Sequence, residues 1–255
     1  MSVIALVSAK GSPGVTMTAL ALAAVWPQRV ALADIDPAGG DLIWRTRTEG
    51  GDPLDPDRGL LSLGAATRRG AGETALVLHL QETSQGVPVL VGVPSPELLS
   101  GLGAVWGQLP AVFAAHHGDV IVDCGRVVPG AAVLPVLNKA DAVVFVVRPD
   151  VEGIAQLRER LATLSGQVES GRIGVIVRTT YRDTRSGADL QQLLDAHGLG
   201  AVVLGVVAED DKGAAVLSST RIGSVRRSLL GRSAVTLTAA IRELAGFTAS
   251  VEVSA

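Results

Sequence analysis

The sequence predicts an α/β protein with a doubly wound, mostly parallel sheet of about seven strands and helices on both faces. Short β-branched runs alternate along the chain with segments of helical periodicity. The runs are nearly continuously apolar, which is typical of parallel strands covered on both faces. Crossovers of helical length between successive runs place helices on both sides of such a sheet.

Each expected strand is one of these apolar runs. The strands are expected at residues 3–7, 30–33, 88–92, 119–123, 142–147, 173–177 and 202–206. Longer segments of helical periodicity predict the helices. They are expected at residues 15–25, 96–115, 152–164 and 234–244, with a short helix around 60–68. The chain shows no repeat or linker, so we expect a single domain over residues 1–246 with a short tail at 247–255.

The composition limits the class of protein. Of the 255 residues, 47% are hydrophobic and 3% aromatic, which predicts one sizeable aliphatic core. The net charge of −3 argues against a globally basic nucleic-acid-binding protein. A single cysteine, Cys124, excludes an internal disulfide and is expected to be a small buried side chain in a reducing compartment. Neither a signal peptide nor a membrane span is expected, and the predicted location is cytoplasmic.

A glycine-rich turn joins the first expected strand to the first expected helix. It reads Ser-Ala-Lys-Gly-Ser-Pro-Gly-Val-Thr over residues 8–16. Backbone N–H groups of such a turn point inward and the helix dipole favours an anion, so this turn is the usual cradle for phosphate. A P-loop would have lysine where this chain has Val15, followed by a hydroxyl for Mg²⁺ such as that of Thr16.

Two kinds of nucleotide site compete for this turn. A Rossmann dinucleotide site needs three spaced glycines and an acidic residue about twenty positions later. Asp34 lies at about that offset from Gly14, but the third glycine is absent, so an NAD-binding enzyme stays an alternative. Ligands of an open α/β sheet gather at the carboxyl ends of its strands. That edge is expected to hold Thr16, Asp34, Asp36 and Asp123. A hydroxyl and three carboxylates beside a phosphate turn favour a Mg²⁺–triphosphate site.

Three segments together resemble the MinD/ParA superfamily of deviant-Walker P-loop ATPases. They are residues 10–16, 33–37 and 120–125, of which the first aligns with the family's loop K-G-G-x-G-K-T. Residues 139–147 and 204–210 look like later strands of the same family, so the resemblance covers almost the whole chain. Within the family, residues 59–61 and 92–97 look most like the TadZ/CpaE branch, which is associated with pilus assembly.

The resemblance implies ATP and Mg²⁺ as ligands and gives roles to single residues. Nucleotide binding falls to Lys10, Gly11, Ser12, Pro13, Gly14, Val15, Thr16, Met17 and Arg178. Thr16, Asp34 and Asp123 would hold the metal and its outer shell, while Asp36 would position the attacking water. Lys10, the second implied catalytic residue, matches a lysine that acts in relatives on the nucleotide of a partner subunit. Arg178 stands where relatives often carry asparagine for the adenine edge.

Val15 replaces the lysine that neutralises the β- and γ-phosphates in relatives, so weak or absent hydrolysis is expected. The resemblance implies a positioning switch that forms a homodimer on binding ATP and recruits a partner protein of a pilus, secretion, cell-pole or other cargo system. A nucleotide-free scaffold and a DNA-associated partition ATPase are the alternatives. The DNA-binding alternative rests on the basic run Arg221, Arg226, Arg227 and Arg232. The tail has no basic amphipathic helix, so membrane insertion is not expected.

Overall fold

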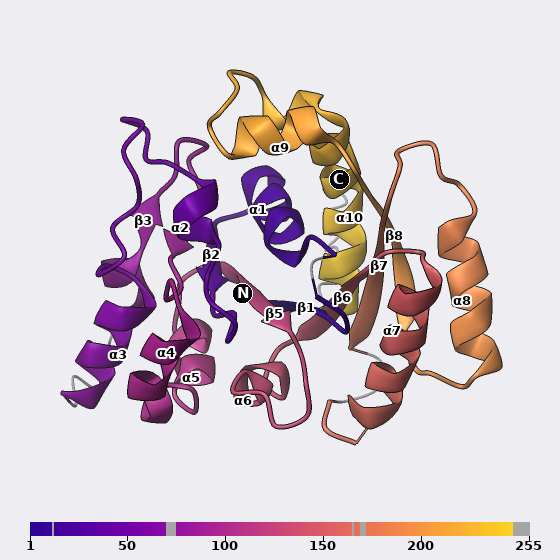
Figure 1. Ribbon diagram of the computed structural model, residues 1–255, viewed down its shortest axis with the longest axis horizontal. Coiled ribbons are helices and arrows are strands. Elements are labelled where there is room, and N and C mark those ends of the chain that lie inside the picture. The colour runs from indigo at the N-terminus through magenta and orange to yellow at the C-terminus, as the bar shows by residue number, and fades with distance from the viewer. Residues whose placement is uncertain (12, 70–74, 165, 169–171, 247–255) are drawn as a thin grey trace, which may run out of the picture.

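An eight-stranded sheet forms the centre of the molecule (Figure 1). The computed structural model describes residues 1–11, 13–69, 75–164, 166–168 and 172–246, so the predicted tail lies outside the described residues. The strands follow the order β3-β4-β2-β5-β1-β6-β7-β8 across the sheet. Their bounds are β1 Val3–Ser8, β2 Val30–Asp34, β3 Gln81–Glu82, β4 Pro88–Leu90, β5 Asp119–Arg126, β6 Ala142–Val147, β7 Ile173–Thr179 and β8 Val202–Ala208.

The predicted fold class is confirmed, with one strand more than the seven expected. All described strand pairs are parallel except β3–β4. The additional strand is β3, a two-residue edge strand that pairs antiparallel with β4. Its residues are Gln81 and Glu82, and so short a polar strand has no apolar run from which it could be predicted.

Helices cover both faces of the sheet (Figure 1). One face carries α1 (Val15–Val25), α2 (Leu42–Arg45), α9 (Asp211–Leu217) and α10 (Leu229–Leu244). The other face carries α3 (Leu60–Arg68), α5 (Leu109–Ala114), α6 (Leu134–Leu137), α7 (Val151–Leu164) and α8 (Ser186–Ala196). The remaining described helices are α4 (Pro96–Leu99) and the 3₁₀ segments η1 (Leu76–His79), η2 (Ser100–Val105) and η3 (Val225–Arg227). Among the described helices, none is long and apolar enough to cross a membrane.

Alternating side chains of the central strands divide the interior into two cores. Ile4 and Leu6 of β1 belong to the core beneath α1 and α10, whereas Ala5 and Val7 belong to the core on the opposite face. All four side chains are fully buried. Because α10 packs against both α1 and β8, it holds α1 firmly on the sheet. The start of α1 is thereby fixed at the carboxyl edge of the strands.

The single helix predicted over residues 96–115 is wrong. The chain forms α4, η2 and α5 there instead. Gly103 and Gly107 interrupt the apolar pattern, and glycine costs about 1 kcal/mol relative to alanine inside a helix. Pro110 starts a new helix because it lies in the first turn of α5, where its missing N–H has no helical partner to lose.

Helix α8 has no counterpart among the predicted elements. Only Leu190 and Leu194 of this helix are buried, so its apolar stripe is too short to produce a clear helical period. The local signal was Asp183, whose Oδ1 accepts 3.0 Å hydrogen bonds from the N–H groups of Arg185 and Ser186. A carboxylate that bonds the first amides of a helix is a typical start signal.

Asp210 fixes α9 and α10 relative to the end of β8. Its Oδ1 accepts hydrogen bonds of 3.1 Å from the N–H groups of Lys212 and Gly213 at the start of α9. Its Oδ2 accepts bonds of 2.8 and 3.2 Å from Leu229 and Leu230 at the start of α10. Partial burial acts to raise the pKa of Asp210, but the four amide donors prevail and lower it. One carboxylate therefore joins the two helices that border the carboxyl edge of the sheet.

Candidate functional site

The loop between β1 and α1 has the geometry of an anion-binding turn. Gly14 is the N-cap of α1 with φ 93°, in the left-handed region that favours glycine. Its carbonyl accepts a 2.9 Å hydrogen bond from the N–H of Thr18, so α1 begins at Val15. The described first turn of α1 carries no acidic residue. The helix therefore presents unpaired N–H groups and the positive end of its dipole to the edge of the sheet.

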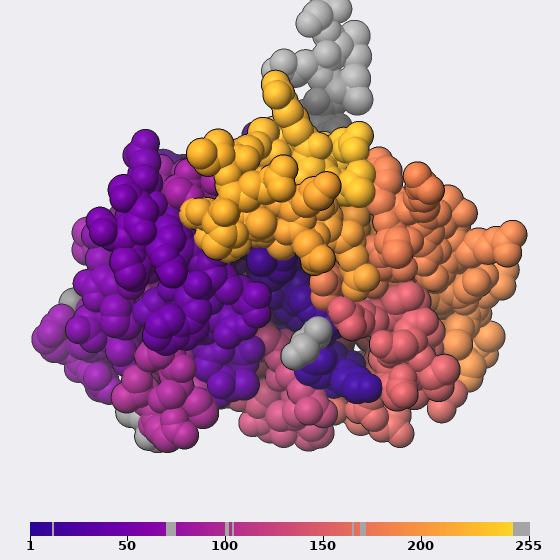
Figure 2. Space-filling model, turned by 45° about the horizontal axis from the view of Figure 1, so that its top comes forward, coloured from indigo at the N-terminus to yellow at the C-terminus, as the bar shows by residue number. Residues whose placement is uncertain are grey.

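A cavity of about 500 Å³ opens beside this loop. In Figure 2 the indigo loop and α1 lie at the base of a hollow between the purple segment on the left and the yellow segment above. The cavity brings together most of the predicted nucleotide-binding residues. Those that line it are Gly11, Pro13, Gly14, Val15, Thr16, Met17 and Arg178, and Asp36, which was predicted to position the attacking water, lines it as well. Ser12 lies outside the described residues.

Asp34 and Asp123 lie at the same level of the sheet, where they pair across β2 and β5. Both side chains are fully buried. The two oxygens of Asp34 accept hydrogen bonds from the N–H groups of Leu42 at 3.1 Å and Asp36 at 3.2 Å. Asp34 thus holds the turn after β2, and its predicted place in the metal's outer shell stays a prediction. Burial, followed by the charge of Asp123, raises the pKa of Asp34.

Asp123 has a buried oxygen without a partner. Its Oδ1 accepts a 3.0 Å hydrogen bond from the N–H of Gly125, but Oδ2 has no hydrogen-bond partner among the described residues. Burial raises the pKa of Asp123 to about 6. The Thr16 hydroxyl on α1 partly opposes this effect, because a nearby donor favours the charged carboxylate and lowers its pKa. A buried carboxylate oxygen of this kind fits a site that receives a cation. The donor set of Thr16 and Asp123 therefore suits Mg²⁺.

Asp36 reaches the cavity from the turn after β2. Its Oδ1 accepts a 2.8 Å hydrogen bond from the N–H of Ala38, and burial raises the pKa of its carboxyl group. The carboxylate rests against Gly125, where a Cβ atom would overlap it. Its position in the cavity is compatible with the predicted role toward water, which stays a prediction.

Lys10 lies apart from this cavity. Its side chain is exposed and lines a smaller neighbouring pocket of about 200 Å³, together with Arg148 and Asp150. The structure therefore does not bring Lys10 to the phosphate side of its own loop. An exposed position at the rim is compatible with action on a second subunit.

Two further arginines line the main cavity and were not predicted from the sequence. They are Arg45 at the end of α2 and Arg126 at the end of β5. Arg126 follows directly after the predicted segment 120–125, so its place in the motif was the available signal. Arg45 had no such signal, because it reaches the cavity only through the packing of α2. Val15, by contrast, is 5% exposed and belongs to the core beneath α1.

The described residues contain no group of three or more His, Cys, Asp or Glu side chains arranged to hold a metal ion. A Mg²⁺ ion at Thr16 and Asp123 would therefore depend on phosphate oxygens and water for the rest of its coordination. This is the usual way in which Mg²⁺ binds in phosphoryl-transfer sites.

Part of the basic run proposed for DNA contact is engaged within the protein. The Nη2 of Arg226 donates a 2.9 Å hydrogen bond to the carbonyl of Val25 at the end of α1. Arg232 lies over the Tyr181 ring, with its guanidinium carbon 5.4 Å from the ring centroid. Arg226 thus caps a helix, and only part of this run remains for phosphate contacts.

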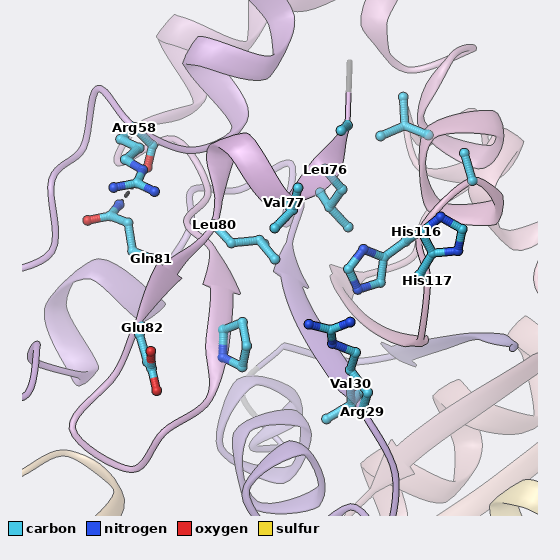
Figure 3. Close-up of a pocket in the computed structure, with 14 residues that line it drawn as sticks. Arg29, Val30, Arg58, Leu76, Val77, Leu80, Gln81, Glu82, His116 and His117 are labelled. Atoms are coloured by element: carbon cyan, nitrogen blue, oxygen red, sulfur yellow. Dashed lines mark hydrogen bonds between the residues drawn. The ribbon is translucent and has the colours of Figure 1, made fainter. Parts of the chain in front are cut away.

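A second cavity, of about 540 Å³, lies beside the amino ends of β2 and β4, at the opposite edge of the sheet (Figure 3). Leu76 and Leu80 contribute to its apolar wall, and the Arg29 side chain extends toward His116 and His117. Burial lowers the pKa of His116, and the charge of Arg29 adds to this effect. Its described lining has neither a glycine-rich turn nor a helix start aimed at it. We therefore assign the candidate site to the β1–α1 loop.

No protein-family model and no curated protein sequence matches the chain. Solved structures do match it. The ParA family ATPase from Chlorobium tepidum TLS is 19% identical, has a TM-score of 0.68, and aligns over 93% of this chain and 97% of that chain. The septum site-determining protein MinD from Pyrococcus horikoshii OT3, solved with Mg-ADP, is 18% identical with a TM-score of 0.69 over 98% and 99% of the two chains. The MinC:MinD complex from Aquifex aeolicus gives 17% identity and a TM-score of 0.63 over 97% of each chain.

The fold is that of a MinD/ParA-type P-loop NTPase. The resemblance drawn from the motifs is thus confirmed at the level of the fold. At these identities the finer resemblance to the TadZ/CpaE branch stays a prediction.

Proposed function

We propose that this chain is a nucleotide-dependent switch of the ParA/MinD type that binds Mg²⁺–ATP at the β1–α1 loop. One observation carries the proposal: an anion-binding turn and a buried carboxylate oxygen without a partner among the described residues occur at the same edge of the sheet. The turn ends at Gly14, and the oxygen is Oδ2 of Asp123. A phosphate with its Mg²⁺ ion satisfies both features at once.

Different residues of the cavity would bind the phosphates, the Mg²⁺ ion and a water molecule. The N–H groups of the loop and the start of α1 would bind the phosphate oxygens. Thr16, supported by Asp123, would hold Mg²⁺, which neutralises phosphate charge when it is bound. Asp36 would orient a water molecule. Val15 offers the phosphates no charge, so this assignment predicts weak binding and slow or absent hydrolysis.

The proposed output of the switch is assembly. Lys10 is exposed at the rim of the loop, where a second subunit can approach it. We propose a homodimer that forms on nucleotide binding and then recruits a protein partner. A MinD of the same fold was solved in complex with MinC, which supports a protein partner for this fold. A pilus or secretion system is the specific expectation, drawn from the TadZ/CpaE resemblance.

A titration of the protein with ATP, with and without Mg²⁺, tests the binding step. We expect Mg²⁺-dependent binding, and a shift from monomer to dimer by light scattering at saturating nucleotide. Thr16→Ala should lose most of the increase in ATP affinity that Mg²⁺ produces. Thr236→Ala, at an exposed position of α10, should keep that increase. Absence of binding at millimolar Mg²⁺–ATP would contradict the proposal and favour the nucleotide-free scaffold.

Titrations with NAD and with duplex DNA test an NAD-binding enzyme and a partition ATPase. Asp34 is fully buried with both oxygens bonded to backbone amides, so it presents no free carboxylate to a ribose hydroxyl. We therefore expect no binding of NAD. Duplex DNA should not bind measurably at physiological salt, because the net charge is −3 and Arg226 is engaged at Val25. Micromolar, salt-sensitive DNA binding would instead support a partition ATPase.

A further inference from the structure

Arg178 places a guanidinium group against the phosphate turn, which has Val15 where the P-loop pattern has lysine. It belongs to β7, and its guanidinium group lies against Gly14 at the cavity. A Cβ atom on Gly14 would be 2.9 Å from Nη1 of Arg178. The same Nη1 donates a 3.2 Å hydrogen bond to the carbonyl of Pro13. The guanidinium therefore contacts the phosphate turn itself.

The other two arginines of the cavity are placed differently. Arg45 is bound by Asp41, whose Oδ2 accepts bonds of 3.1 Å from Nε and 2.8 Å from Nη2. Arg126 is exposed, and its Nε donates a 3.3 Å bond to the carbonyl of Ala9. The Arg178 side chain is 25% exposed, against 46% for Arg45. Of these three cations, Arg178 is the one that is both well shielded from solvent and in contact with the turn.

Arg178 also has donors to spare. A guanidinium group carries five N–H donors, and the described residues accept a hydrogen bond from one of them. Its Nη2 lies 3.9 Å from Oε1 of Glu209, which is beyond hydrogen-bond distance. That same oxygen lies closer to Arg148, at 3.2 Å from its Nη2. Glu209 therefore attracts the guanidinium without occupying its donors, and these remain available to a ligand.

We propose that Arg178 binds the β- and γ-phosphates of the nucleotide. It would thereby supply the positive charge of the P-loop lysine, whose position is occupied by Val15 in this chain. The inference rests on the proposed nucleotide binding at the loop. It assigns Arg178 to the phosphates, whereas the sequence resemblance implied a contact with the adenine base. A planar guanidinium fork bonds phosphate oxygens in pairs, which a valine at the start of α1 cannot do. Gly14 is essential to the arrangement, because any larger residue would displace the guanidinium.

The test uses three probes with the full chain: Mg²⁺–ATP, inorganic tripolyphosphate and adenosine. Arg178→Ala should weaken the binding of Mg²⁺–ATP and of tripolyphosphate by a similar factor, about tenfold or more. Its affinity for adenosine should be unchanged. Arg148→Ala is the matched control, since Arg148 contacts the same Glu209 but lies outside the cavity, and it should change each affinity less than about threefold. Arg178→Gln, which keeps a donor for Pro13 without the charge, serves if the alanine variant does not fold.

A rescue experiment sharpens the test. Val15→Lys in the Arg178→Ala background should restore tripolyphosphate binding, because it returns a cation to the turn from the other side. Loss of adenosine affinity in Arg178→Ala, or unchanged tripolyphosphate binding, would overturn this inference while leaving the proposed function intact. A wild-type protein that binds neither Mg²⁺–ATP nor tripolyphosphate would overturn both.

Discussion

The carboxylate of Asp36 rests on the backbone of Gly125, at the point where the register between β1 and β5 shifts. Gly125 has φ 61°, in the left-handed region, and a Cβ atom there would overlap the carboxyl group. Glycine is therefore required twice at this position, once by the backbone and once by the neighbouring carboxylate. The contact fixes where Asp36 enters the cavity.

Replacing Gly125 with alanine should consequently cost more than the backbone strain alone. The left-handed conformation costs a non-glycine residue about 1–2 kcal/mol, and the overlap with Asp36 adds to it. Gly130→Ala is the matched control, because Gly130 has φ 73° and a Cβ atom added there would meet no described atom within 4 Å. Chemical denaturation should show a larger loss of unfolding free energy for Gly125→Ala than for Gly130→Ala.

A double-mutant cycle isolates the contact. In a background of Asp36→Gly, the additional cost of Gly125→Ala over Gly130→Ala should disappear, because no carboxylate remains to be displaced. Equal costs for the two glycines in the parent protein would show that the contact with Asp36 is unimportant for stability.

Asp123→Asn should reduce the Mg²⁺ dependence of nucleotide binding. Oδ2 of Asp123 is buried and has no hydrogen-bond partner among the described residues, and we expect a cation to bind beside it. The neutral amide of asparagine would bind Mg²⁺ or its water ligands more weakly than the carboxylate does. ATP titrations with Mg²⁺ and with EDTA should differ much less for Asp123→Asn than for the wild type. Asp41→Asn, at an exposed position in the same cavity, should keep the wild-type difference.

The sequence predicted the parts of the site that lie close together along the chain. The apolar run before residue 8 and the glycine at position 14 predict a strand, a turn and a helix, and the structure has all three. Asp34 ends β2, and Asp123 lies opposite it in the parallel strand β5, so their placement at one level of the sheet also followed from the fold class.

The remaining features depend on contacts between distant segments. Arg178 meets Pro13 across 165 positions of sequence, and no local pattern encodes where a long side chain on β7 will point. Gly40 and Gly92 are similar cases, since each packs against Asp34 so closely that a Cβ atom would be 2.8–3.0 Å away. These glycines look like ordinary turn residues until the structure shows what they contact.

Replacing Asp210 with asparagine should weaken the junction of α9 and α10. A carboxylate that accepts four amide hydrogen bonds is both a helix cap and a link between two helices. Loss of such a cap costs about 1–2 kcal/mol. The unfolding free energy at neutral pH should fall by about that amount, whereas Asp211→Asn, which loses only a charge in the first turn of α9, should cost less.

The effect at Asp210 should also depend on pH. Its pKa is lowered in the folded protein, so its stabilisation is fully present above the ordinary carboxyl pKa and is lost as the pH falls through the lowered value. The difference in unfolding free energy between wild type and Asp210→Asn should therefore shrink below about pH 4. A difference that stays constant from pH 7 to pH 3 would show that the charge of Asp210 contributes nothing.

Lys10→Ala should abolish nucleotide-dependent dimerisation without unfolding the protein. The Lys10 side chain is exposed beside the loop and lines a pocket separate from its own phosphate cavity. If two subunits face each other through their loops, two triphosphates come close together and repel. A cation from each subunit, placed in a shared interface of low water content, relieves that repulsion. Light scattering with Mg²⁺–ATP should find a wild-type dimer and a Lys10→Ala monomer.

Lys139→Ala is the matched control, because Lys139 is another exposed lysine that lies near the amino ends of the strands. It should dimerise like the wild type, and all three proteins should share one circular dichroism spectrum. The prediction separates assembly from phosphate binding: Lys10→Ala should still bind tripolyphosphate as a monomer, whereas Arg178→Ala should bind it about tenfold or more weakly. A wild type that stays monomeric at saturating nucleotide, or a Lys10→Ala protein that dimerises as well as the parent, would show that Lys10 does not act across a dimer.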